Sequence, residues 1–174
     1  MNNALFLTLV RFVLLVLAQV LIFNSLNFLG TINPMVYAIF FYWYPLKANR
    51  GLFLLVSFFL GLLIDIFSDT LALNAIASLT VAYARPVILR FCFGVNYEFQ
   101  NFSFKNTTKL QRLTFLALLV LIHHLIFFSL EIFSFAHFLL ILKKVFATGL
   151  VTLVLCALFS SLFSPMPLPR VAPC

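Results

Sequence analysis

The chain has 174 residues, of which 64% are apolar and only 9% are charged, against about 45–50% and about 25% in soluble globular domains. So few charged side chains cannot cover a water-soluble monomer, and so many apolar ones, including 24 phenylalanines, exclude a disordered chain. Because the basic residues behind the net charge of +7 are spread over separate segments, we expect no nucleic-acid partner.

The apolar runs predict an all-α polytopic membrane protein with about six transmembrane helices in one domain, residues 1–164. The first span, 4–26, is longer than the core of a signal peptide, so we expect it to be retained. The second, 30–46, follows a turn signal at Gly30 and carries an aromatic block. It has the minimum length for a span, and a re-entrant segment is the alternative.

Four more apolar runs follow, at 51–67, 70–93, 112–135 and 138–163. The polar stretch 94–111 between the second and third of these runs is expected to be a surface loop. A proline-rich tail, 165–174, ends the chain.

Basic residues predict the orientation. With six spans, both termini lie on one side, together with Lys47, Arg50, Arg85, Arg90, Lys105, Lys109, Arg112 and Arg170. The opposite side has Lys143 and Lys144, so the positive-inside rule makes the side of the termini cytoplasmic.

Two of the four acidic residues, Asp65 and Asp69, are one helical turn apart. If the third helix continues to Asp69, they share a face and could form a catalytic pair or an ion site. In the alternative interpretation, Asp69 caps the fourth helix, and Asp65 holds the connection or meets a polar neighbour. Asp65 is the deeper acid and the better candidate for a partner contact.

Adjacent histidines, His123 and His124, lie near the centre of the fifth span. They point about 100 degrees apart on a helix, so they cannot both line one pore. A metal site or a proton relay is one interpretation, and hydrogen bonds between helices are the more common one. No metal-type spacing, nucleophile elbow or glycine-rich phosphate loop is present. We therefore expect no catalytic residues, no metal and no cofactor.

A stripe of small residues runs along the fourth span. Ala75, Ser78 and Ala82 are spaced by three and four, which places them on one helical face. Such a face lets another helix approach closely.

The stretch 61–86, GLLIDIFSDTLALNAIASLTVAYARP, resembles the MreD family of rod shape-determining proteins, whose third helix ends in a glycine, three apolar residues and an aspartate. Gln19, the INP run at 32–34 and the overall length are also similar to that family. Asn74 with Ala75, and Arg85 with Pro86, look most like its Bacteroidetes members. By this resemblance, Gly61 and Asp65 are the motif residues.

The resemblance implies a non-catalytic scaffold in the bacterial inner membrane that serves cell elongation and peptidoglycan synthesis. Its implied partners are the single-span protein MreC, the cytoskeletal protein MreB, the glycosyltransferase RodA and a penicillin-binding transpeptidase. Membrane lipid and a second copy of the chain are further candidate partners. The implied fold is similar to the substrate-binding subunits of energy-coupling-factor transporters. Asp65→Asn is then expected to weaken partner binding while leaving membrane insertion intact.

A vitamin-binding transport subunit is the alternative function, and a membrane enzyme is a third. Transport subunits of this kind have an A-x-x-x-A pattern in the first helix, where this chain has only Ala4 and Ala18. A substrate pocket would also need several polar residues near the outer face. The sequence points to few: Asn24, Asn27, Asp65, Asp69 and Asn74.

Overall fold

The computed structural model describes residues 2–25, 32–46, 48–94, 104, 107–133 and 138–162. Its regular elements are all helical: α1 (Asn2–Ala18), the π-helix η1 (Gln19–Phe23), the 3₁₀-helix η2 (Val36–Ala38), α2 (Ile39–Trp43), α3 (Arg50–Ser68), α4 (Leu73–Phe93), α5 (Lys109–Ile132) and α6 (Phe138–Leu162). The tail 165–174, the turn at Gly30 and most of the polar loop 94–111 lie outside the described residues.

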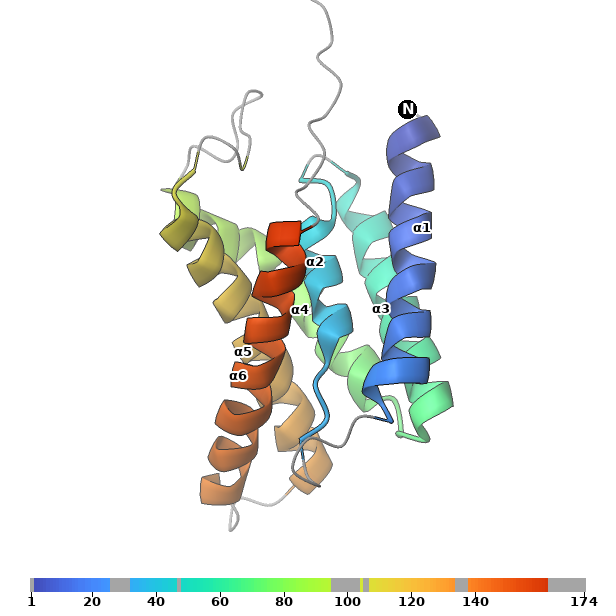
Figure 1. Cartoon of the computed structure of the whole chain (residues 1–174), viewed down its shortest axis with the longest axis vertical. Helices are drawn as coiled ribbons and strands as arrows, with labels where there is room; N and C mark the ends of the chain where they lie inside the picture. Colours follow the sequence, from blue (N-terminus) through green and yellow to red (C-terminus); the bar gives the residue numbers. More distant parts are fainter. Residues whose placement is uncertain are drawn as a thin grey trace, which may run out of the picture.

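Five helices of the described chain are long and apolar enough to cross a membrane. They are α1 with η1, α3, α4, α5 and α6, and they run along the long axis of the molecule (Figure 1). The chain is thus an all-α polytopic membrane protein, as predicted. The start of α1 and the end of α6 lie at one end of the bundle, which we call the terminal end; the other is the opposite end.

The second predicted span differs from the expectation. Within 30–46, only η2 and α2 are helical, and Pro34 and Met35 precede them in non-helical conformation. The segment passes through the bundle from the opposite end, where α1 finishes, to the terminal end, where α3 begins (Figure 1). It is therefore a broken crossing, neither a continuous helix nor a re-entrant segment.

Side chains from other elements satisfy the backbone of this broken crossing. Gln19 Nε2 donates to the Pro34 carbonyl at 3.0 Å, and Gln19 Oε1 accepts from Tyr37 N at 3.3 Å. On the other side, Met35 N donates to Thr152 Oγ1 of α6 at 3.1 Å. Non-helical backbone is tolerated at membrane depth only with such internal partners.

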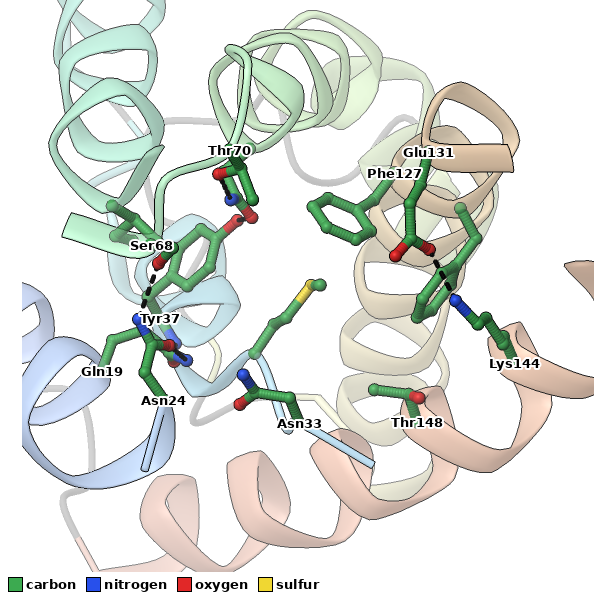
Figure 2. A pocket seen from close by; sticks show the side chains of 14 residues that line it. Gln19, Asn24, Asn33, Tyr37, Ser68, Thr70, Phe127, Glu131, Lys144 and Thr148 are labelled. Atoms are coloured by element: carbon green, nitrogen blue, oxygen red, sulfur yellow. Dashed lines mark hydrogen bonds and ion pairs between the residues drawn. The ribbon is translucent and has the colours of Figure 1, made fainter. Parts of the chain in front are cut away.

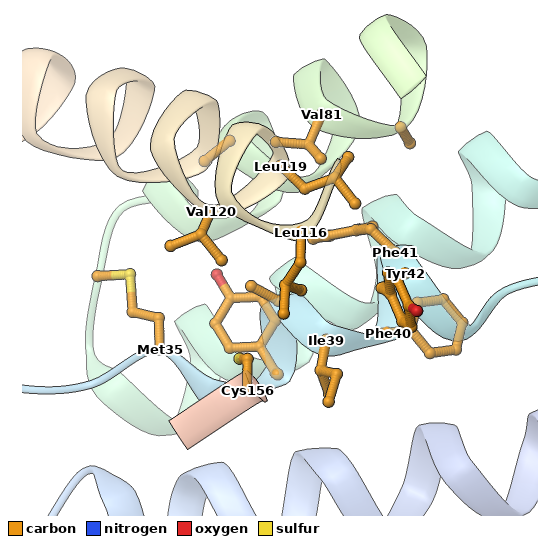
Figure 3. Close-up of a cluster of buried hydrophobic side chains, with 14 of the residues drawn as sticks. Met35, Ile39, Phe40, Phe41, Tyr42, Val81, Leu116, Leu119, Val120 and Cys156 are labelled. Atoms are coloured by element: carbon orange, nitrogen blue, oxygen red, sulfur yellow. The ribbon is translucent and has the colours of Figure 1, made fainter. Parts of the chain in front are cut away.

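The aromatic block of the broken crossing forms the core of the bundle. Ile39 and Phe41 are fully buried, and Phe40 is 1% exposed. Figure 3 shows these side chains between α5 (Leu116, Leu119 and Val120), α4 (Val81) and α6 (Cys156). The outward faces of the long helices are apolar instead, with exposed residues such as Leu9, Leu14, Phe91, Leu139 and Leu150. An apolar exterior around a packed interior is what a lipid environment requires.

The remaining helix boundaries lie close to the predicted ones. The largest differences are of three residues: α4 begins three residues later than expected, α5 both begins and ends three residues earlier, and η1 ends three residues before the predicted end of the first span. The early start of α5 has a local cause. Thr108 accepts from Gln111 N, and the Gln111 side chain accepts from Thr108 N, which is a capping box.

Candidate functional site

The residues of the sequence motif form the junction between α3 and α4. A Cβ atom on Gly61 would lie 2.4 Å from the Asn74 carbonyl oxygen and 2.5 Å from Ala75 Cα. Both distances are far below van der Waals contact. Glycine at this position therefore lets the backbone of α4 touch that of α3.

Asp65, one turn after Gly61, caps the start of α4. Its Oδ2 accepts from Ala75 N at 2.8 Å, and its Oδ1 accepts from Asn74 N and Asn74 Nδ2, both at 3.0 Å. The Thr70 hydroxyl donates to the same Oδ1. Asp65 is 3% exposed, and no ion pair with it is found in the described chain. These donors satisfy both oxygens of the buried carboxylate.

Asp69 lies at the end of α3 and does not cap the start of α4. α3 ends at Ser68, and Asp69 is its C-cap, in left-handed conformation with φ 54°. Its side chain is exposed. The interpretation of Asp69 as the cap of the fourth helix is wrong, because Asp65 makes those contacts. The two carboxylates also do not share a helical face, because α3 does not reach Asp69.

A chain of hydrogen bonds leads from Asp65 into the core. Asn74 Oδ1 accepts from the Tyr37 hydroxyl at 2.8 Å, and the Tyr37 oxygen lies 2.7 Å from His123 Nε2. Since the hydroxyl proton points to Asn74, His123 Nε2 is the donor to Tyr37. His123, Tyr37, Asn74 and Asp65 thus link α5, η2, α4 and α3.

His124 makes a separate set of contacts. Its Nδ1 donates to the Val120 carbonyl at 2.8 Å, and its Nε2 lies 3.1 Å from Thr152 Oγ1 of α6. The two histidines therefore contact different elements, and the interpretation of hydrogen bonds between elements is confirmed. Within the described residues, no group of three or more His, Cys, Asp or Glu could hold a metal ion.

The small-residue stripe of α4 faces inward. Ala75, Ser78 and Ala82 are all fully buried, and Ala75 makes the contact with Gly61. The predicted role of this face in close helix packing is confirmed for Ala75.

A pocket of about 230 Å³ lies among these elements (Figure 2), near the opposite end of the bundle. One wall comes from α1/η1, α3 and α4 and is rich in amides and hydroxyls, including Asn24 and Ser68. The facing wall comes from α5 and α6 and has Phe127, Glu131 and Lys144. The broken crossing supplies Asn33, Met35 and Tyr37.

More polar residues converge on this pocket than the sequence analysis counted. Among them, Glu131 Oε2 and Lys144 Nζ form an ion pair at 3.0 Å across α5 and α6. The sequence has a signal for this ion pair, because the two opposite charges lie on either side of a short connection between two spans. Tyr37 was also missed, although a tyrosine in an apolar run needs a partner for its hydroxyl when buried.

Comparison of this chain with protein-family models, with curated proteins and with solved structures gives no match.

Proposed function

We propose that this protein is a non-catalytic membrane scaffold of the bacterial cell-elongation machinery, similar to MreD. It binds a single-span MreC-like protein and supports side-wall peptidoglycan synthesis. Through that partner it acts with MreB, RodA and a penicillin-binding transpeptidase. The proposal starts from the resemblance of residues 61–86 to that family.

One structural observation carries the proposal: the motif residues are used internally. Gly61 provides the contact between α3 and α4, and both oxygens of Asp65 accept hydrogen bonds from α4 or the turn before it. A carboxylate whose two oxygens both accept from the adjoining helix and turn serves as a structural cap. The motif therefore builds a rigid helical hairpin, which suits a protein that acts through contact.

The outer surface offers room for a partner helix. Only 17% of the membrane-spanning residues are buried in the span formed by α1 and η1, and 22% are buried in α6. The corresponding share is 44% in α4 and in α5. The first span and α6 therefore expose the most apolar side chain surface. A single-span partner would pack against such a surface through van der Waals contacts.

The proposed location is the bacterial inner membrane, with both termini in the cytoplasm. The start of α1 and the end of α6 share one end of the bundle. The described basic residues near the ends of α3, α4 and α5 gather there as well: Arg50, Arg90, Lys109 and Arg112. Lys143 and Lys144 lie near the opposite end, on α6. This distribution follows the positive-inside rule.

The pocket favours a second candidate function, a substrate-binding subunit of a vitamin transporter. It lies between the helices, near the end away from the termini, and has polar groups from most of the long helices. Small-molecule sites in helical proteins often lie between the helices of a bundle and have a few polar groups that converge on the ligand, and this pocket has both features.

Depletion of the protein in its source bacterium separates the two functions. The scaffold proposal predicts that cells lose their rod shape and become round while vitamin uptake continues. Loss of uptake with normal shape would support the transport function and contradict the scaffold.

A further inference from the structure

The pocket at the opposite end of the bundle has a nearly neutral charge balance. One acid, Glu131, and one base, Lys144, line it, and they pair with each other at 3.0 Å. Both side chains remain partly exposed, 37% for Glu131 and 41% for Lys144. Glu131 therefore keeps an oxygen, and Lys144 keeps N–H groups, for a further contact. A ligand with one positive and one negative group would match this pair without leaving a net charge in the pocket.

The broken crossing adds an acceptor that lacks a donor. Asn33 Oδ1 is buried, lines the pocket, and has no hydrogen-bond partner in the described part of the chain. A buried carbonyl oxygen without a donor destabilises the folded protein. A ligand that brings an N–H group into the pocket would remove this cost.

The wall opposite the ion pair adds a hydrogen-bond donor. Ser68 Oγ accepts from Asn24 Nδ2 at 2.6 Å, and its own proton has no acceptor in the described part of the chain. That hydroxyl proton is available to an anionic oxygen. The pocket therefore offers donors for an anion at Ser68 and Lys144, and acceptors for an N–H cation at Asn33 and Glu131.

Size and position narrow the class of ligand. A volume of about 230 Å³ holds roughly eight water molecules and is below the about 300–1,000 Å³ of pockets for drug-sized ligands. The pocket lies among the last turn of α3, the first of α4 and the last of α5. In a bundle that spans the bilayer, these turns lie near the lipid headgroups.

From these contacts we propose that the pocket binds a zwitterionic phosphoethanolamine group, with its ammonium at Asn33 and Glu131 and its phosphate at Ser68 and Lys144. This group is the headgroup of phosphatidylethanolamine, and it also occurs, with the same single negative charge on a phosphodiester, in soluble glycerophosphoethanolamine. The inference does not rest on the scaffold function, since a ligand in the pocket is compatible with either function.

The test measures thermal unfolding of the purified full chain in a neutral detergent. Short-chain phosphatidylethanolamine at ten times its Kd is expected to raise Tm by about 3 °C or more. Phosphatidylcholine, which has no N–H donor for Asn33, and phosphatidylglycerol, which is anionic, should give a smaller shift. Glycerophosphoethanolamine distinguishes the sources: a matching shift indicates a soluble ligand, and a shift with the lipid alone indicates the membrane lipid.

Neighbouring lysines supply the control. Lys144→Gln should abolish the shift, while Lys143→Gln, on the same helix but outside the pocket, should retain it. If Lys144→Gln does not fold, Asn33→Ala serves instead, and it should bring the shifts with phosphatidylethanolamine and phosphatidylcholine close together. Equal shifts for all three lipids in the wild type, no shift at all, or a loss of the shift in Lys143→Gln would overturn the proposal.

Discussion

The carboxylate of Asp65 on α3 accepts a hydrogen bond from the backbone N–H of Ala75 on α4 at 2.8 Å. One turn earlier on α3, Gly61 lies against the backbone of the same residue. The close approach and the cap therefore support each other, since the cap fixes the start of α4 at the point where only glycine leaves room for it.

Asp65→Asn should destabilise the fold. The new NH₂ group cannot accept from Asn74 N and Ala75 N, so one of these buried amides loses its partner. We expect a loss of about 2 kcal/mol or more in unfolding free energy. Asp69→Asn is the matched control, because this position is exposed and asparagine tolerates its left-handed conformation; it should change stability by less than about 0.5 kcal/mol. Unfolding of both variants in detergent checks this, and equal stabilities would contradict the role of Asp65 as a cap.

Gly61→Ala should force α3 and α4 apart. The added methyl would lie 2.4 Å from the Asn74 carbonyl, and overpacking of this kind costs about 1–3 kcal/mol. Gly149→Ala on α6 is the control, since a Cβ there meets only His124 Cγ at 3.9 Å. It should be neutral or stabilising by up to about 1 kcal/mol through helix propensity. Thermal unfolding of the two variants in parallel measures the difference, and a stabilised Gly61→Ala would exclude the close approach.

The two acids show how far the sequence could predict this site. Spacing and depth indicated that Asp65 was the more important of the pair and that α3 and α4 were joined tightly. The cap was assigned to Asp69 because it lies immediately before the predicted start of the helix. The actual turn, with left-handed Asp69 and Ala72, delays α4 to Leu73 and moves its free amides toward Asp65. Such a turn has no clear signal without glycine at those positions.

The second span shows a different limit. Hydropathy placed a crossing at 30–46, and the chain does cross the bundle there. Its broken form depends on Gln19 and Thr152, which satisfy the backbone from elements distant in the sequence. The pocket could not be predicted either, because its residues come from most of the long helices and meet only in the folded chain.

Tyr37→Phe tests the hydrogen-bond chain in the core. Without the hydroxyl, His123 Nε2 and Asn74 Oδ1 lose their shared partner, so we expect a loss of about 1–3 kcal/mol. Tyr83→Phe, at a side chain that is 66% exposed, should have little effect. The measurement is again unfolding in detergent. A Tyr37→Phe variant as stable as Tyr83→Phe would show that these hydrogen bonds do not contribute to the stability of the protein.

Reporter fusions test the proposed orientation. A reporter at Ser103, between α4 and α5, should be cytoplasmic, and one at Ser134, between α5 and α6, should be exported, because the basic residues favour the cytoplasmic side. Paired fusions to alkaline phosphatase and to a fluorescent protein give opposite readouts at each site. An exported Ser103 fusion or a cytoplasmic Ser134 fusion would reverse the assignment.

Copurification of the full-length protein from its native membranes, followed by mass spectrometry, tests the scaffold function most directly. We expect that a single-span MreC-like protein is recovered in stoichiometric amount and that Gly149→Ala retains it. Recovery without any such protein, or with a tightly bound vitamin in its place, would contradict the proposed function.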